Sequence, residues 1–217
     1  MTAVDVPVRA AGLGGLGVRL VPSALADRLP GHPDALRAFK AARHRFLASE
    51  RIDMSALAAE LGVDRTSLFR WVGNRDALLA EILWSLAAPT FDAADAEAPG
   101  GGADRVAGAL TRFVADLISA AAFRAWLTRE PARALRILTT GATCVHARFL
   151  AVTESMLAEE LAAGRMRSPL PPHDLATVLV RVLESYAYAD VVAGEEPDAD
   201  RAAAAFALVL AATRTAP

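Results

Sequence analysis

The sequence has almost no cysteine: Cys144 is the only one among 217 residues. An internal disulfide is therefore impossible, and a reducing compartment is the natural location for such a chain. Long hydrophobic runs are missing too. The longest, from Ala202 to Ala212, falls far short of the roughly 20 residues that a transmembrane helix needs. Asp5 interrupts the start of the chain, so that no signal peptide is indicated. We therefore expect a cytoplasmic protein without a membrane segment.

The residue patterns of common enzyme and metal sites are missing as well. The four histidines are scattered without a His-Glu-x-x-His pattern, and Cys144 with His146 is too small a ligand set for zinc. Neither a Gly-x-Ser-x-Gly elbow nor a phosphate-binding loop occurs. The glycines of residues 12–17 match the dinucleotide-binding pattern, but Pro22 would cut short the long helix that such a site requires. We predict no catalytic residue, no metal ion and no cofactor.

Charge is distributed unevenly along the chain. Residues 1–75 carry 11 basic against 7 acidic residues, a net charge of +4, whereas residues 76–217 carry 12 against 18, a net charge of −6. A basic N-terminal part on an acidic body fits a protein of which only the first part contacts phosphates.

The stretch from Ile52 to Leu79 has the spacing of two short helices joined by a tight turn. Gly62 can adopt a positive φ at the turn, and Asp64 is a suitable N-cap for the second helix. Leu68 and Trp71 give that second helix an inward face. The inward face of the first helix consists of Met54, Leu57, Ala58 and Leu61. This is the helix-turn-helix pattern, in which the second helix enters the DNA major groove. An ordinary helical hairpin is the alternative.

Polar and aromatic side chains remain on the outside of the second helix. Arginine can bind guanine edges, hydroxyl groups can bind most bases, and an aromatic ring can contact the thymine methyl group. Asn74 caps the next helix, and Arg75 at its N-terminus is a candidate phosphate ligand. The outward residues are Arg65, Thr66, Ser67, Phe69 and Arg70.

The run LGVDRTSLFRWVGNRDALL resembles the DNA-reading unit of the TetR family of bacterial repressors. The resemblance implies that Arg65, Thr66, Ser67 and Arg70 face bases or nearby phosphates. It places Ser55 where some members contact a base, Trp71 where the family often has histidine, and Arg75 where it has a phosphate-binding Lys or Arg. Phe69 departs from the family pattern because the usual residue is a tyrosine whose hydroxyl binds phosphate.

The rest of the chain predicts helices and no strand, hence an all-α fold of two domains. Residues 1–31, rich in Gly and Pro, are expected to form an N-terminal arm whose Arg9, Arg19 and Arg28 suit a minor groove. Packing of this arm on its own protein is the alternative. Residues 32–80 form the DNA-binding domain, and residues 81–217 form a helical-bundle domain for ligand binding and dimerisation. The helices are expected near residues 33–49, 74–96 with a disruption at Pro89, 104–121, 122–129, 131–140, 143–163, 174–192 and 197–213.

The last two predicted helices are apolar on more than one face, so that each must be covered on two sides. We expect a homodimer through these helices, which also suits a two-fold operator in double-stranded DNA. A larger monomeric bundle is the alternative.

A small-molecule pocket is expected between the helices of the second domain. Glu184 lies among apolar residues, so that its carboxylate needs a partner: either Arg181 or the polar head of a ligand. The candidate lining residues are Phe113, Leu117, Phe123, Trp126, Leu138, Phe149, Glu184 and Tyr188. Each of them is an ordinary core residue in the alternative reading.

The segments LTREPARALRILTT, ELAAGRM and ESYAYADVVAGEEPD resemble the QsdR-like subgroup of TetR regulators, which are connected with degradation of quorum signals. This resemblance implies a lactone effector. The sequence thus predicts a repressor that a small apolar effector releases from DNA. The alternatives are an all-α interaction module or an all-α enzyme, neither of which would bind DNA.

Overall fold

A computed structural model describes residues 20–213, which form helices, turns and loops without a strand. The all-α class is confirmed. In chain order the helices are α2 (Ala24–Arg28), α3 (Pro33–Leu47), α4 (Met54–Glu60), α5 (Arg65–Val72), α6 (Arg75–Glu97), α7 (Ala103–Ser119), α8 (Ala121–Arg129), α9 (Pro131–Thr139), α10 (Cys144–Ala162), α11 (Pro172–Ala187), α12 (Ala189–Val192) and α13 (Ala199–Leu210), followed by the 3-10 helix η1 (Ala211–Thr213).

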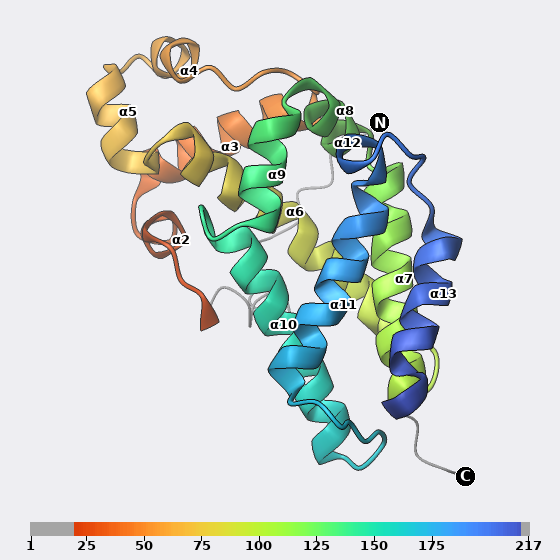
Figure 1. Cartoon of the computed structure of the whole chain (residues 1–217). Coiled ribbons are helices and arrows are strands. Elements are labelled where there is room, and N and C mark those ends of the chain that lie inside the picture. Colours follow the sequence, from red (N-terminus) through yellow and green to blue (C-terminus); the bar gives the residue numbers. More distant parts are fainter. Residues whose placement is uncertain (1–19, 214–217) are drawn as a thin grey trace.

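The N-terminal helices form a small unit at one end of the molecule. Figure 1 shows α4 and α5 at the upper left, far from α7, α11 and α13 on the right. Helix α3 packs against α4, α5 and α6, and Phe39, Leu57 and Leu68 are buried between them. Between α4 and α5, Gly62 has a φ of 69°, as expected for the tight turn.

The described part of the predicted N-terminal arm follows the alternative in which it packs on its own protein. Residues 24–28 form α2, which contacts α5 and α6, and its Leu25 is buried. The helix forms because Ser23 caps it, with the hydroxyl oxygen accepting a hydrogen bond from the amide of Ala26 at 3.0 Å. Arg9, Arg19 and the glycines of residues 12–17 lie outside the described residues.

Helix α6 connects the two parts of the molecule. It starts immediately after α5 and continues through Pro89 to Glu97, packing against α3 at its beginning and against α7 further along. The second part is a bundle in which α7 contacts α6, α11 and α13, while α10 contacts α11. Its centre contains Phe91, Phe113 and Phe149, whose ring centroids lie 5.0–5.4 Å apart. Such pairs stabilise a core beyond simple burial of area.

A buried carboxylate fixes the far end of this bundle. Glu160 of α10 is fully buried and pairs with Arg105 at 2.5 Å and with Arg165 at 2.6 Å. These arginines, Arg165 foremost, lower the pKa of Glu160 to about 2. Its Oε2 also accepts the amide of Gly102 at 2.5 Å. A Cβ at Gly102 would lie 2.3 Å from the carbonyl oxygen of Arg165, so that only glycine permits this close contact.

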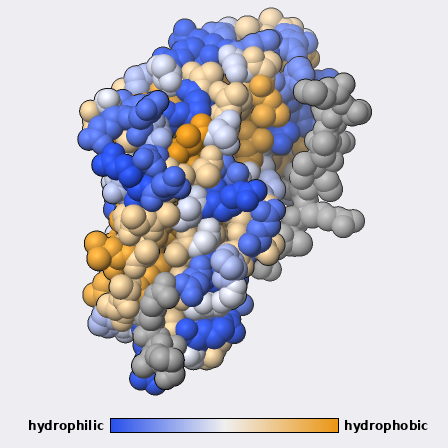
Figure 2. Space-filling view, turned by 90° about the vertical axis from the view of Figure 1, so that its right-hand side faces the viewer, coloured by the Kyte–Doolittle hydropathy of each residue, from blue (hydrophilic) through white to orange (hydrophobic). Residues whose placement is uncertain are grey.

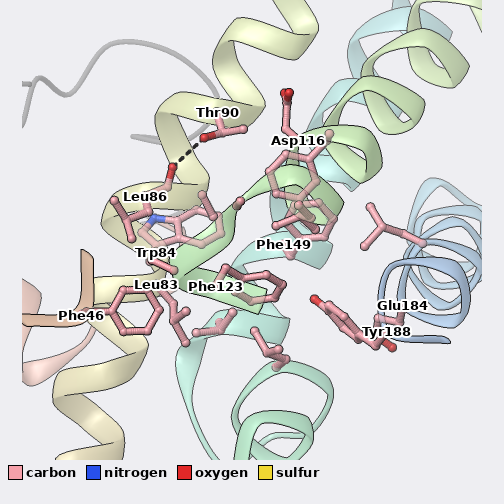
Figure 3. A pocket seen from close by; sticks show the side chains of 18 of the residues that line it. Phe46, Leu83, Trp84, Leu86, Thr90, Asp116, Phe123, Phe149, Glu184 and Tyr188 are labelled. Atoms are coloured by element: carbon pink, nitrogen blue, oxygen red, sulfur yellow. Dashed lines mark hydrogen bonds between the residues drawn. The ribbon is translucent and has the colours of Figure 1, made fainter. Parts of the chain in front are cut away.

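The prediction of one helix over residues 174–192 is wrong in detail. The chain breaks at Tyr188, where φ is −117° and ψ is 20°, and α12 begins after it. At this break the aromatic ring of Tyr188 points toward the interior of the bundle, with its centroid 6.1 Å from that of Phe123 (Figure 3).

Candidate nucleic-acid interface and effector cavity

The recognition helix, α5, begins as the sequence predicts. Asp64 is its N-cap, and its carboxylate accepts hydrogen bonds from the amide of Ser67 at 2.8 Å and from the hydroxyl of Ser67 at 2.7 Å. These bonds lower the pKa of Asp64. Leu68, Trp71 and Val72 are buried behind the helix. The local geometry is therefore that of a helix-turn-helix with a well-anchored second helix.

Most of the predicted DNA-binding residues lie on the outer face of α4 and α5. Ser55, Arg65, Thr66 and Arg70 are exposed, and Phe69 is 51% exposed although it is a large apolar residue. Within residues 20–213 the guanidinium groups of Arg65 and Arg70 have no hydrogen-bond partner, so that both are available to DNA. Ser67 is half-buried and donates its hydroxyl proton to Asp64. It can therefore only accept a hydrogen bond from a base.

Trp71 does not belong to this outer face. Its side chain is 9% exposed and its ring lies 5.8 Å from that of His32. Trp71 follows the buried Leu68 by three residues and so lies on the same inward face of α5. It is therefore not available for the DNA contact that the family resemblance suggested. Asn74 is exposed, but its Oδ1 accepts the amide of Ala77 at 2.8 Å as the cap of α6. Only its amide nitrogen is free to donate.

Arg75, the predicted phosphate ligand, is held by the second domain. Its two terminal nitrogens donate to the carboxylate of Glu130 at 2.7 and 2.5 Å, and both side chains are only 14% exposed. Arg75 lowers the pKa of Glu130. The next residue, Asp76, pairs with Arg133 and Arg136 of α9. In the conformation described here, Arg75 therefore binds a carboxylate where the sequence predicted a phosphate.

A second contact supports the recognition helix from α2. Arg28 donates from one terminal nitrogen to the carbonyl oxygens of Arg70 at 2.7 Å and Trp71 at 2.6 Å. These carbonyls belong to the last turn of α5, where a cation is favourable. The sequence prediction missed this role, although Ser23 and Leu25 supply the cap and the buried residue of a short helix.

Helix α2 is in turn held by a buried ion pair. Arg148 of α10 is fully buried and donates to Glu81 of α6 at 2.9 Å and to the carbonyl oxygen of Val21 at 2.8 Å. The hydroxyl of Ser23 donates to Glu81 at 2.6 Å, as does the thiol of Cys144 at 3.3 Å. Burial raises the pKa of Cys144 to about 12, so that its sulfur remains a thiol donor. These groups connect α2, α6 and α10.

A cavity of about 320 Å³ is lined by residues of α3, α6, α7, α8, α9 and α10 and of the end of α11. This volume is within the range of small-molecule sites, about 300–1,000 Å³. Seven of the eight predicted residues line it: Phe113, Leu117, Phe123, Leu138, Phe149, Glu184 and Tyr188. Figure 3 shows labelled aromatic side chains from several helices meeting around this space.

Trp126 is the exception among the predicted lining residues. It is 1% exposed and packs behind the wall, with ring centroids 5.9 Å from Phe46 and 6.1 Å from Phe123. Phe123, three positions earlier on α8, takes the place at the cavity surface. Trp126 is therefore a core residue, as the alternative reading held.

The sequence prediction missed the lining residues that α3 and α6 supply. Phe46 and Leu47 end α3, and Leu47 is 47% exposed. Helix α6 adds Leu83, Trp84, Leu86, Ala87 and Thr90. An occupant of the cavity would therefore touch both the helix that supports the helix-turn-helix and the helix that connects the domains.

The polar groups around the cavity are few and mostly paired. Glu184 binds Nδ1 of His146 at 2.9 Å and Arg181 at 2.6 Å. Of the two alternatives that the sequence left open for its carboxylate, the structure shows the pair with Arg181. The hydroxyl of Thr90 donates to the carbonyl oxygen of Leu86 at 2.9 Å (Figure 3). Asp116 lies 3.5 Å from Arg112. The hydroxyl of Tyr188 has no hydrogen-bond partner within residues 20–213.

Comparisons with known proteins agree with this geometry. The family "Tetracyclin repressor-like, C-terminal domain" matches residues 101–211. The structure of the R. erythropolis transcriptional repressor QsdR, from the TetR family, is 31% identical, with a TM-score of 0.76 over 87% of this chain and 100% of that chain. The chain belongs to the TetR family.

A putative TetR-family transcriptional regulator from Mesorhizobium loti shares the fold, with 17% identity and a TM-score of 0.53 over 89% of this chain and all of the other. No curated protein sequence gave a match. TetR proteins are DNA-binding transcriptional regulators and not enzymes. The family resemblance predicted from LGVDRTSLFRWVGNRDALL is therefore confirmed.

Within residues 20–213, no group of three or more His, Cys, Asp or Glu side chains is placed to hold a metal ion. Helix α6 is long and apolar enough to span a bilayer. Helices α7 and α8 reach this length and hydropathy only when they are taken together as one bent span. Half of the apolar window of α6 is buried in the protein, as is typical of a core helix.

Proposed function

We propose that this TetR-family regulator is a cytoplasmic repressor that binds an operator as a homodimer and leaves it when a small apolar effector enters the cavity. The single observation that carries the proposal is that one cavity contacts both α3 and α6. Because α3 packs on the recognition helix and α6 begins next to it, an occupant can alter the orientation of α5. The 31% identity to the repressor QsdR supports the repressor sense, and we keep a lactone as the proposed effector.

In this proposal α5 enters the major groove and Ser55, Arg65, Thr66, Ser67, Phe69 and Arg70 face the DNA. The exposed, unpaired guanidinium of Arg65 is at the N-terminal end of α5, the part of a recognition helix that reaches base edges. Phe69 is exposed without a polar group, so that a sugar or a thymine methyl is its expected contact. Asn74 is at the start of α6, where backbone amides suit a phosphate.

Replacing Arg65 by alanine tests the DNA interface. We expect the variant to lose about 1–3 kcal/mol of DNA-binding free energy and to lose base preference at one position of the operator. Genomic selection of bound DNA would first supply the operator, and titration of single-base variants would then locate the affected position. Arg37→Ala, an exposed arginine of α3 that pairs with Asp34, is the control. Equal binding by Arg65→Ala and the parent protein would show that α5 does not read the operator.

Glu130→Gln tests whether Glu130 competes with DNA phosphate for Arg75. Removing the carboxylate charge should free the guanidinium, raising affinity for all sequences on the order of tenfold. The slope of log K against log salt should steepen by about 0.9, which corresponds to one additional phosphate contact. Arg75→Ala should lower the affinity for all DNA sequences alike and reduce the steepness of log K against log salt. Fluorescence anisotropy at several salt concentrations measures both quantities, and unchanged slopes in both variants would contradict the proposed role of Arg75.

The dimer of the proposal uses the outer face of α11 and α13. Leu208 is 79% exposed and Val178 is 40% exposed. The neighbouring outward positions are small: Ala204 and Ala207 of α13, and Ala211 at the start of η1. Exposed leucine beside alanines allows close helix contact with a second copy. Figure 2 looks onto the side of the molecule where α7 and α13 lie and shows hydrophobic surface at its lower left edge.

A further inference from the structure

Two donors among the residues that line the cavity have no hydrogen-bond partner within residues 20–213: the indole nitrogen of Trp84 and the hydroxyl group of Tyr188. The hydroxyl group of Tyr188 is directed into the cavity (Figure 3). Its side chain is 6% exposed, and Figure 3 shows the ring extending from the end of α11 into the space beside Phe123. Burial raises the pKa of Tyr188, so that the group remains a protonated donor. A hydroxyl that faces the cavity without a protein partner can donate to an acceptor that a ligand supplies.

The charged groups near the cavity are already neutralised by protein partners. Each carboxylate oxygen of Glu184 has its own donor, His146 at one and Arg181 at the other. The second nitrogen of His146 lies 3.5 Å from Arg181. Arg124, which lies near Tyr188, is held by Asp190 and by the carbonyl oxygen of Ala187. A charged ligand would therefore enter without an ionic partner.

The remaining wall is apolar and aromatic. The residues that form it include Leu83, Trp84, Phe113, Phe123, Leu138, Val145 and Phe149. Asp116 stands near the part-exposed end of α7 and is paired with Arg112, away from the buried aromatic residues. A buried charge without a partner costs several kcal/mol, whereas an apolar body gains from burial.

We propose that the cavity binds a neutral, mostly apolar molecule with one hydrogen-bond acceptor, such as a carbonyl oxygen, and that the hydroxyl of Tyr188 donates to this acceptor. This inference rests on the proposed function only in taking the cavity as the effector site. It specifies the chemistry of the effector: no net charge, one acceptor and a hydrocarbon body.

Calorimetric titration of the full-length protein with three probes of equal chain length tests the inference. 2-Decanone should bind at least about tenfold more tightly than decanoate or decylammonium, because only the ketone enters without an unpaired charge. Tyr188→Phe should weaken 2-decanone binding about 3- to 10-fold, the effect of one neutral hydrogen bond. Tyr186→Phe is the matched control, because Tyr186 lies against Arg201 and not at the cavity.

Tighter binding of decanoate or decylammonium, absence of binding by all three probes, or equal affinity of Tyr188→Phe and Tyr186→Phe for 2-decanone would overturn the inference. Melting temperatures of the two variants verify that both are folded. Release of operator DNA is measured separately by anisotropy with the same ketone. If 2-decanone binds in a Tyr188-dependent manner but does not release the operator, the inference is supported and the effector-controlled repression proposed above is contradicted. Failure of the inference can therefore be told apart from failure of the proposed function.

Discussion

Leu208→Arg should convert the protein into a monomer and lower operator affinity by more than about 100-fold, because a single recognition helix retains little beyond non-specific binding. Leu208 is 79% exposed in the described structure, so that the substitution places no charge in the core of the protomer. In the proposed dimer, however, the guanidinium would meet its symmetry mate near the two-fold axis, without a counter-charge and away from water. Light scattering gives the mass, and anisotropy gives the operator affinity.

Val192→Arg is the matched control for this prediction. Val192 is 63% exposed and lies on α12, at the opposite end of the bundle from the C-terminal end of α13 (Figure 1). It should leave both mass and operator affinity unchanged. A dimeric Leu208→Arg variant would refute the interface through α11 and α13, and a monomer with the parent's operator affinity would refute the need for a dimer in DNA reading.

Helical periodicity and capping residues predicted most helices of the fold, but not α2 or the break at Tyr188. Asp64 and Asn74 cap the helices that follow them, and Gly62 takes the positive φ that the turn requires. Seven lining residues of the cavity follow from a similar principle, because the inward face of a bundle helix is visible in its apolar spacing. Periodicity does not determine which inward residue borders a void. Trp126 and Phe123 share the inner face of α8, and only their packing against Phe46 and Tyr188 distinguishes them.

Ion pairs between residues that are distant in sequence could not be predicted from the sequence. Arg75 has the position of a phosphate ligand, but whether its guanidinium is free depends on Glu130, 55 residues away and in the other domain. Similarly, Glu81 and Arg148 are unremarkable charges on two separate helices until the fold buries them together. A motif therefore identifies the surface that reads DNA, whereas electrostatic competition for its residues requires the tertiary structure.

The Glu81–Arg148 pair is the basis of the second large effect that we expect. Arg148→Met would leave the carboxylate of Glu81, 5% exposed, with only the hydroxyl of Ser23 and the thiol of Cys144 as partners. Breaking a buried ion pair costs about 3–5 kcal/mol, which corresponds to a fall in melting temperature of roughly 10 °C for a chain of this size. The melting temperature is measured by monitoring thermal unfolding with circular dichroism.

Two further variants determine whether the loss comes from an uncompensated charge. Glu81→Met combined with Arg148→Met should recover much of the stability, since a buried ion pair can be replaced by apolar residues of similar volume. Arg112→Met, which removes a 55% exposed arginine, should change stability by less than about 1 kcal/mol. If the double variant is no more stable than Arg148→Met alone, packing and not charge explains the loss.

Because the Glu81–Arg148 pair lies next to α2, we expect Arg148→Met to affect the DNA-binding domain as well. Arg148 holds the carbonyl oxygen of Val21, Glu81 accepts from Ser23, and α2 follows directly. At the other end of α2, Arg28 donates to carbonyl oxygens in the last turn of the recognition helix. Arg148→Met should therefore speed hydrogen exchange of the α2 amides of Asp27 and Leu29 more than that of amides within α7, which lacks such a connection. Equal acceleration in both helices would mean that α2 is not anchored through this pair.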